Sequence, residues 1–498
     1  MPHSQAVEAP SGGPRGSGTP RADRDGLWSP GRRGLTGGLA LTITLVAFEA
    51  LAISTVMPVV AADLGGIELY GWVFTAFMLA SLVGIVVAGA LIDRRGLGFP
   101  FAAGLTLFAI GLVIGGLAPT MPVLVAARVI QGLGAGVIPP VAYVAIGRSL
   151  PERLRPRMFA TLSTAWVLPG VLGPAIAGVV ADLFDWRLVF LGLLPMLAVA
   201  AAISFRPVAS IGSPAPSSAG EATAAASMRR RLPLALAVAL GTGLVLAGLT
   251  SGAVVATIGL LAAGLVLGLP AIARLTPPGT LRAARGLPTA VLMRGILTFV
   301  FFGVEAYVAL ALVDGRGLSA AQAGISLTVA TVTWTAGSWI QARFASRIDP
   351  ERFIVVGLAV TIVGLAAFAA VLLPGVTPWV SIPTVAVAGL GMGLAYSPTT
   401  LIVLRRAAAG EQGSASAALS LADSLGTALG TGITGAFVAA AARGGLASTA
   451  GLAPGFAVAI GVGLAGLVVG RRLREASEPA TVGERARAAA AGTGPAEA

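Results

Sequence analysis

Short polar segments divide the chain into a long series of apolar stretches, most of them near twenty residues or longer. A helix of this length crosses the hydrocarbon core of a bilayer, and only helices or closed barrels satisfy their backbone hydrogen bonds there. Of the 498 residues, 56% are hydrophobic and 11% are charged, against about 25% charged in ordinary soluble domains. The sequence therefore predicts an all-α, multi-pass membrane protein.

Polar loops separate fourteen expected spans, of which the seventh and eighth are divided only by a break at Thr250, Ser251 and Gly252. A search window of about nineteen residues matches the length of a membrane-crossing helix. The approximate limits are 36–61, 70–92, 100–118, 122–147, 157–182, 187–206, 232–249, 252–273, 288–313, 322–343, 353–373, 378–404, 412–440 and 452–470.

All 33 basic residues are arginines, and their distribution predicts an orientation. Twenty-eight fall in the tails and the even-numbered loops, three fall on the opposite side, and Arg128 and Arg294 lie inside spans. An excess of arginine marks the cytoplasmic side of a membrane protein. We therefore expect a protein of the cell membrane with both termini in the cytoplasm. Topology and contact with anionic headgroups explain the net charge of +12, so we expect no nucleic-acid partner.

The second half of the chain repeats the glycine spacing of the first half. Gly71, Gly104 and Gly111 recur 253 positions later, and the glycine-rich run 132–136 recurs 257 positions later at 389–393. The offset skips eight spans, so a span and its copy cross the membrane in the same direction. Parallel repeats build transporters from two bundles that are related by an axis along the membrane normal.

The repeat and the loop composition divide the chain into six segments. The N-terminal tail is rich in Ser, Gly, Pro and Arg, and the stretch after the sixth span has the composition of a flexible linker. The expected segments are a disordered cytoplasmic tail at 1–34, a six-helix bundle at 35–206, a cytoplasmic linker at 207–231, an extra two-helix hairpin and loop at 232–287, a second six-helix bundle at 288–471 and a cytoplasmic tail at 472–498.

The loop after the second span carries a motif that runs from Gly89 to Gly96 as Gly-Ala-Leu-Ile-Asp-Arg-Arg-Gly. It resembles the Gly-x-Leu-Ala-Asp-Arg-x-Gly-Arg motif of the major facilitator superfamily, although Leu97-Gly98 replaces the final basic position. In such a motif Gly89 allows close helix approach, Asp93 and Arg94 form a cytoplasmic charge latch, and Gly96 allows a tight turn. The resemblance implies the major facilitator fold of two six-helix bundles, here with two extra spans. The alternative is an ordinary charged loop.

In the fourth span, Arg128, Gln131 and Gly132 are similar to the Arg-x-x-Gln-Gly pattern of the same superfamily. An arginine this far inside a span costs about 2.5–3.5 kcal/mol on insertion scales, so it needs a partner or water. The alternative is that Arg128 reaches the outer interface with its long side chain.

The fifth span contains Gly170, Gly173, Pro174 and Gly178, which resemble the Gly-x-x-x-Gly-Pro antiporter motif of drug exporters. Ala177 stands where a glycine is usual. Small residues let helices approach closely, and Pro174 removes a backbone donor and bends the helix. Together with the number of spans, the motif implies the fourteen-helix drug:proton antiporter branch, and generic small-residue packing is the alternative.

Three acids lie within expected spans, where a charge demands a partner or a function: Glu49, Glu305 and Asp423. First spans of each bundle usually line the cavity in this superfamily, so the resemblance implies that Glu49 and Glu305 face each other across it. Desolvation favours the neutral form of a carboxyl group, which suits proton exchange. A fixed partner is the alternative for each acid. Arg294 precedes Glu305 by about 16 Å along a helix, which excludes direct pairing but allows both to line the cavity.

Phe301 and Phe302 flank Glu305 one turn earlier, where they form either a wall for a lipophilic cation or ordinary core packing. The chain has no cysteine, no lysine and a single histidine, His3. This composition excludes thiolate and histidine metal sites in the spans and the lysine of a phosphate-binding loop. We therefore expect no enzyme and no cofactor, with a proton gradient as the energy source.

The sequence as a whole predicts a monomeric, proton-coupled exporter that works on small lipophilic or cationic compounds in the lipid bilayer by alternating access. A lipid or glycolipid exporter and a proton-coupled nutrient importer are alternatives with the same fold. A transport-inactive receptor or scaffold is the alternative from another class.

Overall fold

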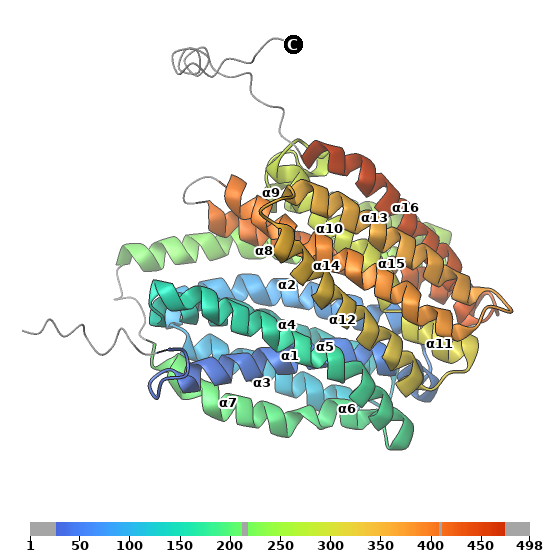
Figure 1. Cartoon of the computed structure of the whole chain (residues 1–498), viewed down its shortest axis with the longest axis horizontal. Helices are drawn as coiled ribbons and strands as arrows, with labels where there is room; N and C mark the ends of the chain where they lie inside the picture. The colour runs from blue at the N-terminus through green and yellow to red at the C-terminus, as the bar shows by residue number, and fades with distance from the viewer. Residues whose placement is uncertain (1–25, 212–217, 408–410, 474–498) are drawn as a thin grey trace, which may run out of the picture.

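The computed structural model describes residues 26–211, 218–407 and 411–473. Within these ranges the regular structure is helical and no strand occurs, as the apolar spans predict. The long helices run along a common direction in Figure 1, where the blue-to-teal first half of the chain lies mostly below the yellow-to-red second half. The tails predicted at 1–34 and 472–498 lie mostly outside the described residues.

The helices fall into a first bundle, a hairpin and a second bundle. The first bundle contains α1 (Arg33–Leu64), α2 (Tyr70–Arg95), α3 (Gly98–Gly116), α4 (Met121–Ser149), α5 (Arg155–Leu183), α6 (Arg187–Leu191) and α7 (Leu193–Ala209). The hairpin contains α8 (Ser218–Thr250) and α9 (Val254–Leu275). The second bundle contains α10 (Leu287–Glu305), α11 (Val308–Arg316), α12 (Ala320–Phe344), α13 (Pro350–Ala369), α14 (Ser381–Arg406), α15 (Gln412–Arg443) and α16 (Leu452–Gly470).

Thirteen helical segments of the described chain are long and apolar enough to cross a membrane. The remaining expected span, at 322–343, corresponds to α12, whose 25 residues give a length of about 37 Å. α12 is less apolar because it carries many Thr and Ser residues, and it packs against both α5 and α14. The predicted all-α membrane fold is confirmed.

Two ends of the molecule are distinguished by their arginines. The arginine-rich end holds the first residues of α1 and α5 and the last residues of α2, namely Arg33, Arg155 and Arg95. The arginine-poor end holds the other termini of these helices and the start of α12 at Ala320. These two names are used below without reference to a side of the membrane.

The glycine repeat of the sequence is also a repeat of packing. A Cβ added to Gly132 in α4 would collide with the Phe77 carbonyl of α2, and one added to Gly389 in α14 would collide with the Ala330 carbonyl of α12. Gly132 and Gly389 occupy corresponding positions in the two halves, and so do Phe77 and Ala330, whose carbonyls they contact. Glycine lets the helix backbones meet at these crossings, because any side chain would hold them apart.

The ninth expected span, 288–313, is interrupted between α10 and α11 at Ala306 and Tyr307. The Tyr70 hydroxyl of α2 donates to the Ala306 carbonyl at 3.4 Å, and the Tyr307 hydroxyl donates to the Thr431 carbonyl of α15 at 2.6 Å. A break inside a membrane is tolerated where neighbouring helices supply such partners. It leaves Glu305 as the last residue of α10.

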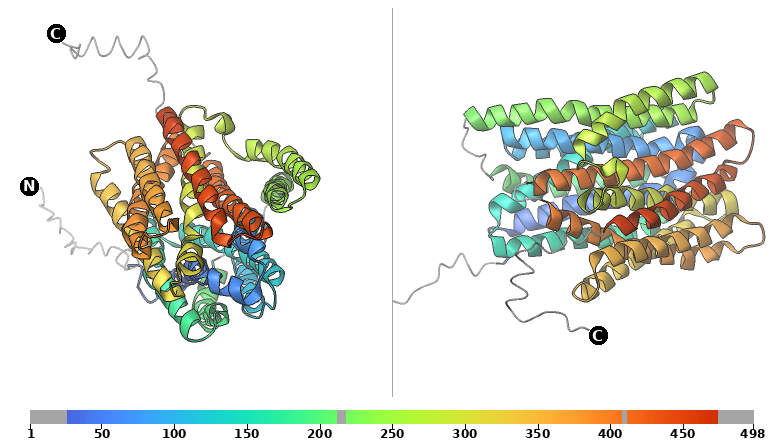
Figure 2. Two further views of the ribbon diagram at one scale, coloured as in Figure 1. Left: turned by 90° about the vertical axis from the view of Figure 1, so that its right-hand side faces the viewer. Right: turned by 90° about the horizontal axis from the view of Figure 1, so that it is seen from above.

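The hairpin α8–α9 lies at the periphery, as the left view of Figure 2 shows. Val238 and Ala271 from the hairpin join an apolar cluster with Leu79 of α2 and Leu425 of α15, so the hairpin covers the seam between the two bundles. The break predicted at residues 250–252 separates α8 from α9. The linker expected at 207–231 overlaps two helices, because α7 extends to Ala209 and α8 begins at Ser218 in a stretch rich in helix-forming alanine.

Candidate transport site

Glu49 and Arg128 form an ion pair inside the first bundle. The Arg128 side chain of α4 donates to the Glu49 carboxylate of α1, and both side chains are almost completely buried, at 2% and 3% exposure. Arg128 also donates to the Val73 carbonyl at 3.1 Å, and its guanidinium lies 4.2 Å from the centre of the Phe77 ring. These contacts provide the partner that a charge in a span requires.

Each residue of the Arg-x-x-Gln-Gly pattern has a role in this arrangement. Gln131 lies one turn after Arg128 and accepts a hydrogen bond from it at 2.7 Å, while Gly132 lets α4 approach α2. Arg128 has the partner that an arginine inside a span needs, so the alternative in which it reaches the outer interface is not seen. Glu49 has a fixed partner within its own bundle, and this pairing offsets the cost of burying both charges.

A second ion pair lies in the other bundle. Arg294 of α10 is 3.5 Å from the Asp423 carboxylate of α15, and it donates to the Thr400 hydroxyl of α14. Its guanidinium lies 3.5 Å from the centre of the Tyr396 ring. Arg294 is 3% exposed, whereas Asp423 is 32% exposed and is therefore accessible to water or to a ligand.

The sequence singled out Arg294 and Asp423 but not Tyr396 or Thr400. A tyrosine and a threonine four residues apart on an apolar helix carry no distinctive spacing. Their position one turn apart in α14 places them on a single helix face, but only the packing of α14 against α10 brings that face to Arg294.

Glu305 differs from the other two acids because it has no cation partner among the described residues. It contacts the Ser54 hydroxyl of α1, whose oxygen lies 3.5 Å from Oε1 of Glu305. Ser54 belongs to the first bundle and Glu305 to the second, so this acid lies where the first spans of the two bundles meet. The predicted absence of direct pairing with Arg294 is consistent with Arg294 binding Asp423 instead.

An aromatic cluster lies beside both acids of the second bundle. Phe301 contacts Phe302 and Trp334 at ring-centre distances of 5.2 and 5.3 Å, and Trp334 contacts Tyr396 at 5.3 Å. Phe301 is buried, whereas Phe302, Trp334 and Tyr396 are partly exposed. Such ring contacts stabilise the bundle, and the partly exposed faces offer an apolar and cation-attracting surface.

The glycine and proline motif of α5 faces the second bundle. A Cβ added to Gly178 would lie 2.6 Å from the Ala321 Cα, and the Pro174 carbonyl lies 2.7 Å from the position of a Cβ on Gly324. Gly170 contacts Thr331 in the same row, whereas Gly173 faces Phe48 of α1 instead. Small residues therefore bring α5 and α12 into backbone contact over the arginine-poor half of both helices.

The loop motif between α2 and α3 is only partly arranged as the resemblance implies. Gly96 has a φ of +71°, so the tight turn requires glycine as predicted. Gly89 does not mediate a close approach, because a Cβ there would meet nothing within 4 Å. Asp93 and Arg94 are exposed, and no hydrogen bond or ion pair connects either of them to another described residue. The predicted latch is not formed in this conformation, in which the bundles meet at the opposite end.

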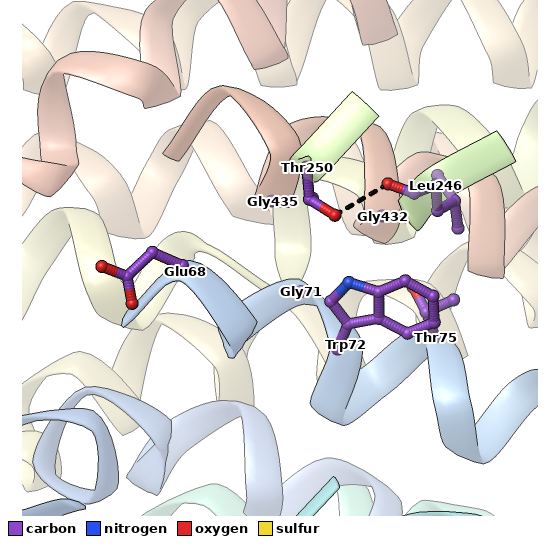
Figure 3. A pocket seen from close by; sticks show the side chains of 8 residues that line it. All are labelled: Glu68, Gly71, Trp72, Thr75, Leu246, Thr250, Gly432 and Gly435. Atoms are coloured by element: carbon purple, nitrogen blue, oxygen red, sulfur yellow. Dashed lines mark hydrogen bonds between the residues drawn. The ribbon is translucent and has the colours of Figure 1, made fainter. Parts of the chain in front are cut away.

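Hydrogen bonds between the bundles lie in the arginine-poor half. Besides the Ser54–Glu305 and Tyr70–Ala306 contacts, Thr75 bonds the Ala428 carbonyl at 3.1 Å. A narrow crevice adjoins this contact where α2, α8 and α15 meet, as Figure 3 shows with Thr250 bonded to the Leu246 carbonyl. Its glycine-lined walls belong to all three structural units, so the hairpin closes over the seam at this end.

Two bundles related by a parallel repeat, with ionisable groups inside their spans, define a secondary transporter. The sequence profile of the Major Facilitator Superfamily matches residues 39–431. The chain belongs to this superfamily, and it is a transporter rather than an enzyme, of a kind that needs no cofactor.

Curated relatives extend the match over most of the chain. A "Probable multidrug-efflux transporter" of Mycobacterium tuberculosis is 28% identical over 423 residues, which cover 81% of this chain and 86% of the relative. The methylenomycin A resistance protein of Streptomyces coelicolor is 26% identical over 378 residues, which cover 73% of this chain and 78% of the relative.

Solved structures share the fold. A bacterial homologue of the human lysosomal transporter Spinster, in an inward-facing conformation, has a TM-score of 0.61 at 17% identity and covers 90% of this chain and 100% of its own. The xylose transporter XylE from E. coli, in an inward-open conformation, has a TM-score of 0.60 at 14% identity and covers 91% and 98%.

Proposed function

We propose that this chain exports small lipophilic or cationic compounds from the cytoplasm in exchange for protons, as a monomer with both termini in the cytoplasm. Membership of the superfamily and relatives named for drug efflux and antibiotic resistance support export. The 28-to-3 division of loop and tail arginines supports the orientation. In that orientation the bundles are closed at the outer end.

The observation that carries the coupling proposal is the different partnership of the three intramembrane acids. Glu49 and Asp423 each pair with an arginine, whereas Glu305 has no arginine partner within the described part of the chain and contacts a serine hydroxyl of the opposite bundle. A carboxylate without a cation is costly inside a membrane, so it suits binding of a proton. Separation of the bundles at the outer end breaks the Ser54 contact and exposes Glu305 to external protons.

The aromatic cluster next to Glu305 is the proposed substrate wall. Phe302, Trp334 and Tyr396 present partly exposed rings within one connected set, and Asp423 adds a partly exposed carboxylate. A lipophilic cation would gain apolar and cation–π contacts from the rings and a charge contact from the acid. Protonation of Glu305 on one side and substrate binding on the other then drive opposite movements of the bundles.

A compound panel in a host lacking its own efflux pumps tests this function. We expect the parent chain to lower accumulation of lipophilic cations such as ethidium, and a proton uncoupler to abolish the effect. Glu305→Gln should abolish it as well, whereas Glu68→Gln, the same change in the crevice at the arginine-poor end, should not. Uncoupler-sensitive uptake of a sugar or peptide, or flipping of lipids without drug export, would support the alternatives instead.

A further inference from the structure

The outer end of α5 carries an acid, Asp182, whose negative charge is unfavourable for that helix. Asp182 is one residue from the C-terminal end of α5, where the helix dipole disfavours a negative charge. Its carboxylate instead accepts the backbone N–H groups of Ala320 at 3.1 Å and Ala321 at 2.9 Å. These are the first two residues of α12, so an acid of one bundle caps a helix of the other.

α12 does not need this acid in order to begin. Ser319 and Gln322 form a complete capping box, with the Gln322 N–H bonded to Ser319 Oγ at 3.3 Å and the Ser319 N–H bonded to Gln322 Oε1 at 2.9 Å. The Ala323 N–H bonds the Ser319 carbonyl at 3.0 Å. Asp182 therefore accepts hydrogen bonds from the two backbone N–H groups of α12 that the capping box does not satisfy.

We propose that Asp182 is the latch that holds the two bundles together at the arginine-poor end and that it must release in every transport cycle. The inference rests on the proposed alternating-access function and adds a gating residue to it. Asp182 is exposed, so water replaces its partners when the bundles part and the latch opens without burying a charge. The backbone contact of Gly178 with Ala321 one turn away keeps the two helix ends in register when it closes.

The distance between the bundle ends tests the latch directly. The cysteine-free chain accepts spin labels at two exposed positions, Phe184→Cys in the first bundle and Leu446→Cys in the second. We expect Asp182→Ala to raise the ratio of separated to closed ends about tenfold, because two hydrogen bonds to a charged group are lost. Asp182→Asn, which keeps one acceptor, should give a smaller rise.

Asp185 supplies the matched control three residues along. Among the described residues its carboxylate bonds Arg187 of its own bundle, at 2.9 and 3.5 Å, and no residue of the second bundle. Asp185→Ala therefore removes the same charge without breaking a contact between the bundles. An unchanged distance distribution in both Asp182 variants, or an equal change in Asp185→Ala, would overturn the proposal. The measurement is made without substrate or pH gradient, so it separates failure of the latch from failure of the proposed drug and proton specificity.

Discussion

Glu49 and Glu305 lie in the first helices of the two bundles, α1 and α10, but their surroundings differ. Arg128 donates to one carboxylate oxygen of Glu49 at a buried position and also donates to Gln131, while the second carboxylate oxygen of Glu49 has no hydrogen-bond partner among the described residues. Glu305 has no cation partner among the described residues and contacts the Ser54 hydroxyl of the other bundle. We therefore expect the first acid to have a structural role within its bundle, and the surroundings of the second to change when the bundles move.

At this scale we predict that Glu49→Gln destabilises the protein, because it leaves Arg128 buried without a counter-charge. Removing one member of a buried pair costs about 3–5 kcal/mol, whereas neutralising both costs much less. Thermal unfolding in detergent should show a large loss for Glu49→Gln and recovery in the double variant Glu49→Gln/Arg128→Gln. Asp63→Asn in the same helix, which breaks an exposed pair with Arg187, should change stability by less than about 1 kcal/mol. Equal stability of Glu49→Gln and the parent would contradict a structural role for the pair.

Among the elements, the spans could be predicted from the sequence, because apolar length and arginine-bearing loops follow directly from the thickness of a bilayer. The partners of the charged residues could not, since Glu49 and Arg128 are 79 positions apart and their pairing depends on how α1 packs against α4. The break after Glu305 was also missed. Ala306 and Tyr307 are ordinary helix residues, and the break depends on hydroxyl partners from α2 and α15.

Helix crossings lead to a prediction about three glycines. Gly132→Ala and Gly389→Ala should each cost about 1–3 kcal/mol, because the new methyl group meets a backbone carbonyl that must move. Gly89→Ala is the matched control in α2, where nothing lies within 4 Å, and it should be neutral or stabilise the helix by about 0.5–1 kcal/mol. Unfolding of the purified variants measures all three, and a loss in Gly89→Ala equal to the others would refute the packing account.

The α2–α3 loop gives a separate prediction. Asp93 and Arg94 are exposed and unpartnered within the described chain, as expected if their contact forms only when the arginine-rich ends close. Asp93→Asn should therefore reduce export about tenfold or more at normal expression, since a few kcal/mol suffice to trap one state. Glu152→Gln, which removes an exposed acid at the same end, should leave export unchanged. Full activity of Asp93→Asn would show that the motif serves only as a turn between α2 and α3.

For the whole molecule, the arginine asymmetry predicts an orientation that labelling can check. Single cysteines in place of Arg155 and Asp314, at opposite ends of the spans, provide the probes on the cysteine-free chain. An impermeant thiol reagent added to intact cells should label position 314 and not position 155, while both should react in broken membranes. Labelling of position 155 in intact cells would show that the topology is the opposite of the predicted one.

If Glu305 carries the coupled proton, as we propose, binding of substrate to the purified protein should release that proton into solution. On addition of ethidium in weak buffer, the parent and Glu68→Gln should release protons, whereas Glu305→Gln should bind ethidium and release none. Asp423→Asn should weaken binding of the cation but still release protons with the ethidium that binds. Proton release from Glu305→Gln equal to that of the parent, at equal occupancy by ethidium, would contradict the account and move the coupling to Asp423.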